Sequence, residues 1–192
     1  QVKPTQISMV TFFDNGSPIL GNPDATITLI EFGDYQCHFC NVYFHNTEHK
    51  IFENYVMTGK VNMIFKDFTI IGPDSVVAAH ASHCASEQGK FWEFHNTLYN
   101  NWDGEETGWA GQENIVKYAQ ENNLNINQFI ECNNELKYQN LITNSNSDAK
   151  SLGITGTPAF YIISMNTQQV QTLSGAQPYE VFERIFNSML DT

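Results

Sequence analysis

The sequence has no long apolar segment and little positive charge. No run of apolar residues approaches the ~20 that an α-helix needs to cross a bilayer. Nine Lys and Arg residues stand against 21 Asp and Glu residues, which gives a net charge of −12. This acidic balance argues against nucleic acid or an anionic membrane surface as a partner. The sequence also has no internal repeat and no low-complexity tract.

An initiator Met and a signal peptide are missing as well. The chain starts at Gln1-Val2-Lys3-Pro4, so we expect a mature or trimmed start whose targeting segment has been removed. The length of 192 residues and the hydrophobic content of 41% suffice for one sizeable core or two small layers. They predict one compact, soluble unit.

Cysteine is scarce, and two of the four cysteines form one motif, Cys37-His38-Phe39-Cys40. The motif follows a predicted strand and opens a predicted helix, which is typical of a redox site. A helix N-terminus presents unpaired N–H groups and the positive end of the helix dipole, and both stabilise the thiolate of Cys37. Cys40 lies close enough in sequence to close a disulfide ring with it. Half of a zinc site has the same spacing, but no second pair of this kind is present.

The other two cysteines, Cys84 and Cys132, are more than a redox motif needs. Four cysteines allow three pairings, and their number and spacing alone do not choose among them. Each of these two lies on a candidate buried stripe of a predicted helix, so packing of the two helices could bring the thiols together. Two unpaired core cysteines are the alternative. An even count beside a motif that needs an oxidising partner favours a Cys84–Cys132 disulfide that tethers the helices.

One helical face carries three residues that are able to bind metal, His80, His83 and Cys84. A metal-binding module could use these residues or the Cys37–Cys40 pair. Histidines on a helix face are more often ordinary core or surface groups. No metal site is therefore predicted.

The first half of the chain predicts a βαβ unit. A strand covers Thr26–Phe32, a helix runs from Cys37 to about Met57, and a second strand covers Lys60–Phe68. Two strands joined by a helix of this length are expected to be parallel with a right-handed crossover. Before this unit, the apolar stretch Ile7–Phe13 predicts a short strand or arm.

The second half contains a helical block and then returns to strands. The predicted helices of the block are roughly Ser75–Gln88, Lys90–Tyr99, Gln112–Glu121, Asn127–Leu136 and Leu136–Leu152. Strands at Ala159–Ile163 and Gln169–Leu173 follow, and the helix Tyr179–Leu190 ends the chain. The strands on both sides of the block can form one mixed sheet. The order predicts an α/β protein of thioredoxin topology (βαβ…ββα) with an all-helical insertion, in which residues 1–72 and 153–192 form the thioredoxin-like domain and residues 73–152 the inserted helical subdomain.

A carboxylate stands out in the first predicted strand. Alternation along that strand places Ile27, Leu29 and Glu31 on one face. Glu31 is either an acid at the edge of the core that reaches solvent, or a buried acid beneath the thiols. In the second case it would accept or relay the Cys40 proton, because burial raises a carboxyl pKa toward the working pH.

From about Ile19 onward the sequence resembles the DsbA-type thiol-disulfide oxidoreductases. The motifs that carry this resemblance are Leu20-Gly-Asn-Pro-Asp-Ala25, Glu31-Phe-Gly-Asp-Tyr-Gln-Cys-His-Phe-Cys40, Glu87-Gln-Gly-Lys-Phe-Trp-Glu-Phe-His95 and Gly153-Ile-Thr-Gly-Thr-Pro-Ala-Phe160. The resemblance implies that Pro158 is cis and lies against the C-x-x-C motif, where the Thr157 backbone meets a substrate chain. The chain departs from the family's usual Pro-His dipeptide. Here the imidazole of His38 adjoins Cys37 and could stabilise its thiolate, while the apolar ring of Phe39 suits unfolded clients.

The resemblance also implies a function. An extracytoplasmic enzyme would put disulfides into unfolded or partly folded exported proteins with free thiols, with Cys37 as the exposed nucleophile and Cys40 as its shielded partner. It would need no cofactor, and a membrane thiol oxidase of the DsbB or VKOR type would recharge it. A reductase or isomerase on the same fold, a metal-binding module and a non-catalytic binding domain are the alternatives. Isomerases of this group usually carry a dimerisation domain, for which the chain has no room.

Overall fold

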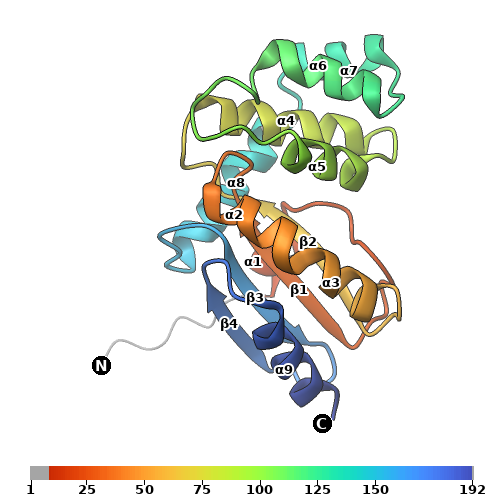
Figure 1. The fold of residues 1–192 in the computed structure, drawn as a ribbon, viewed down its shortest axis with the longest axis vertical. Coiled ribbons are helices and arrows are strands. Elements are labelled where there is room, and N and C mark those ends of the chain that lie inside the picture. The colour runs from red at the N-terminus through yellow and green to blue at the C-terminus, as the bar shows by residue number, and fades with distance from the viewer. Residues whose placement is uncertain (1–8, 192) are drawn as a thin grey trace.

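A four-stranded mixed sheet forms the centre of the molecule. The computed structural model describes residues 9–191 (Figure 1). The strands β1 (Ile27–Gly33), β2 (Val61–Asp67), β3 (Ala159–Ser164) and β4 (Val170–Ser174) lie in the order β2-β1-β3-β4. β1 pairs with β2 in parallel, while β3 runs antiparallel to both β1 and β4. The predicted thioredoxin-like mixed sheet is confirmed.

One face of the sheet is covered by the helical segment that follows the redox motif and by the last helix. The segment consists of α2 (His38–Tyr43), a π-helical turn (Phe44–Glu48), α3 (His49–Ile51) and a second π-helical turn (Phe52–Val56). The last helix, α9 (Tyr179–Leu190), packs beside it on the same face. The rings of Tyr43, Phe160 and Phe182 meet at centroid distances of 4.6 to 5.6 Å. Sequence periodicity predicts one continuous helix here but not its π-helical turns.

The opposite face is covered by α1 (Val10–Phe13) and α8 (Gln139–Ser151). Within the described residues, the prediction of a strand or arm at Ile7–Phe13 is wrong, because Val10–Phe13 forms a helical turn; Ile7 lies outside the described residues. The Phe12 ring packs against Tyr161 at 4.9 Å. This contact with the sheet is one that local sequence cannot reveal.

α8 is fastened to the sheet by a buried ion pair. Lys66 on β2 is fully buried, and its Nζ lies 2.8 Å from Oδ2 of Asp148 on α8. The same ammonium donates a hydrogen bond to the carbonyl of Asp14. α8 therefore packs against both the sheet and the helix α4 (Pro73–Ser86) of the predicted insertion. The division of the chain into a thioredoxin-like domain and a helical subdomain ending at residue 152 stays a prediction.

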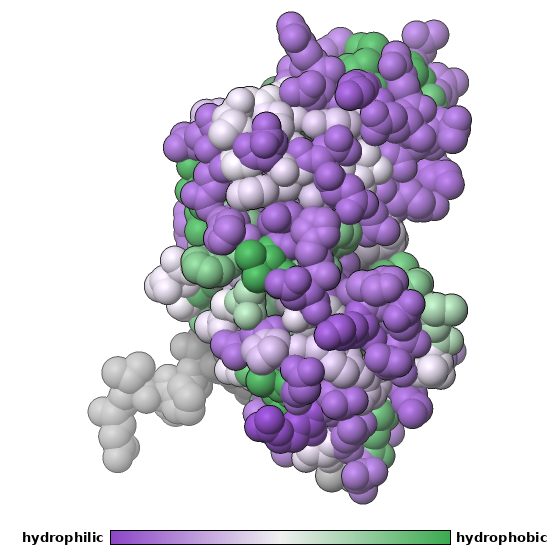
Figure 2. Space-filling view, viewed as in Figure 1, coloured by the Kyte–Doolittle hydropathy of each residue, from purple (hydrophilic) through white to green (hydrophobic). Residues whose placement is uncertain are grey.

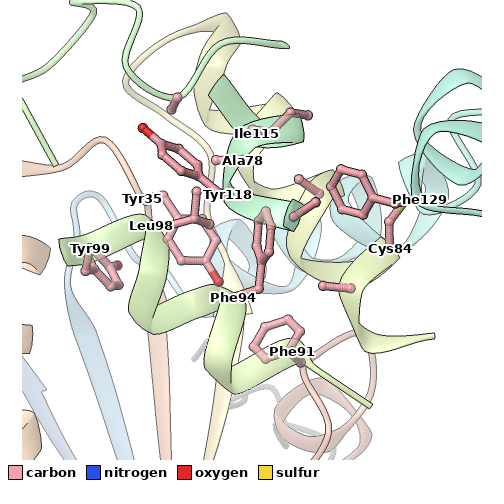
Figure 3. Close-up of a cluster of buried hydrophobic side chains, with 14 of the residues drawn as sticks. Tyr35, Ala78, Cys84, Phe91, Phe94, Leu98, Tyr99, Ile115, Tyr118 and Phe129 are labelled. Carbon is pink, nitrogen blue, oxygen red and sulfur yellow. The ribbon is translucent and has the colours of Figure 1, made fainter. Parts of the chain in front are cut away.

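The remaining helices form a lobe above the sheet (Figure 1). They are α4 (Pro73–Ser86), α5 (Phe91–Asn100), α6 (Gln112–Glu121) and α7 (Ile126–Asn134). Figure 3 shows the rings of Phe91, Phe94 and Phe129 in the core between them. This core also includes Cys37 and Cys40, so the lobe packs directly against the redox motif. None of the helices in residues 9–191 is long and apolar enough to cross a membrane.

The Cys84–Cys132 disulfide predicted from sequence is present between α4 and α7, with Cα atoms 5.8 Å apart. Both cysteines are buried, with exposed fractions of 1% and 4%. The bond closes a separation of 48 residues and ties the two helices together inside the lobe.

Candidate redox site

The redox motif begins where β1 gives way to α2. β1 ends at Gly33, and Cys37 occupies the N-cap position of α2 in an extended conformation, with φ −64° and ψ 125°. Both cysteines are free thiols. Cys40 is completely buried, and Cys37 keeps an exposed fraction of only 5%. Cys37 is thus the more accessible of the two but is not the openly exposed residue that the sequence predicts, because the lobe packs against it.

The two thiols have opposite electrostatic environments. A hydrogen bond with the Cys40 thiol contributes most to lowering the pKa of Cys37 to about 6, helped by the Thr157 side chain and the N–H groups of Cys40 and Phe39, while burial opposes the shift. Burial raises the pKa of Cys40 well above its usual value, and its hydrogen bond to Cys37 adds to this. Cys37 is therefore the thiolate of the pair near neutral pH, and Cys40 keeps its proton.

The Thr157–Pro158 peptide bond is cis and lies beside the motif. The Cys37 Sγ is 3.4 Å from the Thr157 carbonyl oxygen. A pocket of about 330 Å³ continues from this point between residues 152–161 and 172–175. Thr157 and Pro158 line this pocket, and the Cys37 sulfur lies beside it, in contact with the Thr157 carbonyl.

The two residues between the cysteines lie at the surface. The His38 ring packs between the rings of Phe39 and Trp102, at 5.2 and 5.6 Å. Phe39 has an exposed fraction of 59%. In Figure 2 the surface is mostly hydrophilic, and an apolar area interrupts it near the middle of the view, where Figure 1 places α2. The largest contributions to the Cys37 pKa come from other groups, so tuning by the His38 imidazole stays a prediction.

Glu31 lies on β1 with an exposed fraction of 2%, so the alternative of an acid that reaches solvent is wrong. Burial raises its pKa well above the usual value, and the charges of Glu48 and Cys37 add to the effect. Glu48 is a second buried acid that we do not predict from the sequence. It lies eight residues after Cys40 on the same helical segment, 3.6 Å from the His95 ring. The sequence could have indicated Glu48 only by its helical spacing from Cys40, which places the two residues on the same side of the segment.

The turn before the motif is held by Asp34 and Gln36, neither of which is predicted from sequence. Asp34 is buried, and its carboxylate accepts hydrogen bonds from the N–H groups of Gln36, Ile70 and Ile71 at 2.7 to 3.0 Å. The Gln36 side chain donates to Ser75 Oγ at 2.9 Å. These bonds connect the turn to the chain that leads into α4 and fix the direction in which Cys37 points.

The three residues of the helical face considered for a metal, His80, His83 and Cys84, have structural partners instead. The Cys84 sulfur is part of the disulfide. The His83 Nε2 lies 2.7 Å from Oδ2 of Asp67, and the His80 Nε2 accepts the Tyr138 N–H at 3.0 Å. Within residues 9–191 no group of three or more His, Cys, Asp or Glu side chains could hold a metal ion.

Comparison with known proteins supports the assignment of this site. The family model described as Thioredoxin matches residues 14–182, which is most of the chain. Disulfide bond formation protein D of Bacillus subtilis is 34% identical over 97 residues, which cover 50% of this chain and 44% of the relative. The probable disulfide bond formation protein D of Bacillus cereus is 26% identical over 147 residues, 74% of this chain and 68% of the relative.

Solved structures show the same fold. Oxidised BdbD of Bacillus subtilis superposes with a TM-score of 0.81 at 23% identity, over 92% of this chain and 94% of that one. α-DsbA1 of Wolbachia pipientis gives a TM-score of 0.80 at 28% identity, over 91% of this chain and 90% of that one. With the paired thiols at the start of α2 and the family model covering most of its length, the chain belongs to the thioredoxin family and, within it, to the DsbA-like protein-disulfide oxidoreductases.

Proposed function

We propose that this oxidoreductase puts disulfides into exported proteins by exchange through a Cys37–Cys40 disulfide. The observation that carries the proposal is the asymmetry of the two thiols. Cys37 has a pKa lowered to about 6, while that of Cys40 is raised by burial. A stable Cys37 thiolate favours the reduced form of the pair, and a disulfide that is readily reduced is a good oxidant of substrates.

The reaction consists of two exchanges at Cys37. A substrate thiolate attacks the Cys37 Sγ, the Cys37–Cys40 bond breaks and a mixed disulfide with the substrate forms. Cys40 leaves with the electron pair and takes up a proton. A second substrate thiolate then attacks the substrate sulfur of the mixed disulfide, and Cys37 leaves as the thiolate that its surroundings stabilise. The substrate gains one disulfide, and the enzyme is left with two reduced cysteines.

Glu31 is the proton partner that we assign to Cys40. It is buried near the thiols, and burial raises the pKa of its carboxyl group well above the usual value, which favours the protonated form. A protonated Glu31 can donate to the departing Cys40 sulfur and recover the proton when Cys40 is reoxidised. Burial thus favours the protonated form of both Glu31 and Cys40, which suits a proton transfer between them.

The substrates that fit the site are unfolded or partly folded proteins with free thiols. The Thr157 backbone offers an edge for an extended chain, and the exposed Phe39 ring offers an apolar contact. No charged side chain of the motif contacts the pocket at Pro158, so we expect broad selectivity. We place the reaction outside the cytoplasm, where disulfides persist, with a membrane thiol oxidase of the DsbB or VKOR type as the partner that restores the Cys37–Cys40 bond.

A peptide-oxidation assay tests the proposal. Oxidised protein is mixed with a reduced peptide that carries two cysteines, and formation of the peptide disulfide is followed. Stoichiometric oxidation, lost in Cys37→Ser, is the expected result. A protein that reduces insulin disulfides readily but leaves the peptide reduced would instead be a reductase on the same fold. Inactivity in both assays would indicate a binding domain without catalysis.

A further inference from the structure

A carboxylate from the helical lobe reaches the N-terminus of the redox helix. Glu105 lies in the loop between α5 and α6, and its Oε1 accepts the backbone N–H of His38 at 2.9 Å. This N–H belongs to the first residue of α2 and follows Cys37 directly. The first N–H groups of a helix lack partners within the helix and attract anions. Glu105 thus places an anion where the redox motif begins.

The same helix end also stabilises the Cys37 thiolate. The N–H groups of Phe39 and Cys40 are among the groups that lower the Cys37 pKa. Three consecutive N–H groups are therefore divided between two anions: Glu105 accepts that of His38, and the thiolate accepts those of Phe39 and Cys40. The Cys37 thiolate and the Glu105 carboxylate are like charges at the same helix N-terminus, so they repel each other.

The loop that carries Glu105 is held in place on both sides of this residue. The Trp102 indole N–H donates to the Gln36 carbonyl at 2.9 Å, and the Glu106 N–H donates to Gln36 Oε1 at 2.9 Å. The His38 ring packs against Trp102. Gln36 immediately precedes Cys37, so these bonds connect the loop to the redox motif. They hold the Glu105 carboxylate in position against the His38 N–H.

We propose that Glu105 restrains the oxidising power of the Cys37–Cys40 pair, a role that rests on the function proposed above. In the disulfide form Cys37 carries no charge, and the carboxylate binds the helix end without opposition. In the dithiol form the thiolate, held by the N–H groups of Phe39 and Cys40, and the carboxylate, held by that of His38, lie at one helix end and repel each other. The contact therefore stabilises the disulfide relative to the dithiol and makes the enzyme a milder oxidant than its helix N-terminus alone would make it.

The substitution Glu105→Gln tests this role, since the amide keeps the hydrogen bond acceptor and removes the charge. Wild type and variant are equilibrated with glutathione redox buffers, and the fraction of the Cys37–Cys40 disulfide is measured. We expect the variant's equilibrium to shift about twofold to fivefold toward the dithiol, the size typical of one charge at a helix terminus. A fivefold shift corresponds to about 20 mV for this two-electron couple. The Cys37 thiolate should also titrate at a lower pH than in the wild type.

The neighbouring substitution Glu106→Gln is the matched control. It removes the same charge from the same loop, and the backbone N–H that Glu106 gives to Gln36 remains. We expect its potential to stay close to that of the wild type. The difference between Glu105→Gln and the wild type should shrink in 1 M NaCl, because exposed charges are screened at high salt.

The outcomes separate the two proposals. Equal potentials in wild type and Glu105→Gln, or the same shift in Glu105→Gln and Glu106→Gln, would overturn the role of Glu105 while leaving the oxidase function intact. A wild type that forms no Cys37–Cys40 disulfide in any glutathione buffer, or that forms one but oxidises no peptide, would contradict the proposed function instead. Thermal unfolding of both variants confirms that each is folded.

Discussion

Cys37 and Cys40 lie three positions apart, but their pKa values shift in opposite directions because the backbone and the helical lobe surround them differently. Cys37 lies at the N-cap of α2 and receives the N–H groups that follow it, whereas Cys40 lies one turn inside the helix and is fully covered. Desolvation disfavours a thiolate, and hydrogen bonds favour it. Hydrogen bonds outweigh desolvation at Cys37, and desolvation outweighs hydrogen bonds at Cys40. Only Cys37 is therefore a thiolate near neutral pH.

At neutral pH the reduced protein should thus present one reactive thiol. We expect alkylation of the reduced protein by iodoacetamide to modify Cys37 first, with a rate that rises through a midpoint near pH 6. Cys37→Ser should abolish exchange, while Cys40→Ser should accumulate mixed disulfides because the resolving thiol is gone. Mass mapping of the alkylated peptides decides which cysteine reacts; faster modification of Cys40 would reverse the roles assigned here.

The buried acids offer a second prediction at this scale. Burial is the largest cause of the raised pKa of Glu31, and the charge of Glu48 is the next. Glu48→Gln should therefore lower the pKa of Glu31 without returning it to its usual value. The carboxyl stretch followed by infrared spectroscopy across pH measures this, with Glu31→Gln to identify the band. Glu53→Gln, which changes an exposed acid on the same helical segment, serves as the control. An unchanged Glu31 titration in Glu48→Gln would show that the two acids do not interact.

At the scale of elements, the lobe depends on the tie between α4 and α7. Opening the Cys84–Cys132 bond frees a separation of 48 residues in the unfolded chain. The chain-entropy model assigns about 4 kcal/mol to a loop of this size. The Cys84→Ala/Cys132→Ala variant, compared with wild type while Cys37–Cys40 is oxidised in both, should lose about this much free energy of unfolding. Urea denaturation measures the loss, and an unchanged midpoint would mean that packing alone holds the lobe.

Most elements could be predicted from the sequence because their patterns are local. The continuous apolar run of β1 reflects burial on both faces, and the stripes that contain Cys84 and Cys132 reflect two helices that pack together. Residues that act across the chain left no such pattern. Glu48 and Glu105 are single acids among many, and their meaning comes from what the fold places beside them, Glu31 in one case and the His38 N–H in the other. The helical turn of α1 likewise depends on the contact between Phe12 and Tyr161.

At the scale of the whole molecule, ionisation of Cys37 should make the stability of the reduced protein depend on pH. The Cys37 pKa is depressed in the folded dithiol form, to about 6 against an ordinary value of 9.0. A depressed pKa contributes stability that is fully present above the unfolded value and is lost as the pH falls through the folded value. Between pH 6 and pH 9 the reduced protein should therefore gain stability with rising pH relative to Cys37→Ser. Urea unfolding under reducing conditions checks this, and parallel pH profiles of the two proteins would contradict it.

If the proposed function holds, the internal Cys84–Cys132 bond would make each new copy of the protein a substrate of older copies. Both sulfurs are buried once the lobe has closed, so an oxidant must reach them on a chain that is still open. An open chain with free thiols is the kind of substrate proposed above for this enzyme. Under the proposed function, formation of this bond should be autocatalytic: newly made chains mixed with oxidised enzyme should form the Cys84–Cys132 bond faster than chains without it. Without oxidised enzyme, the first chains would depend on slower, uncatalysed oxidation.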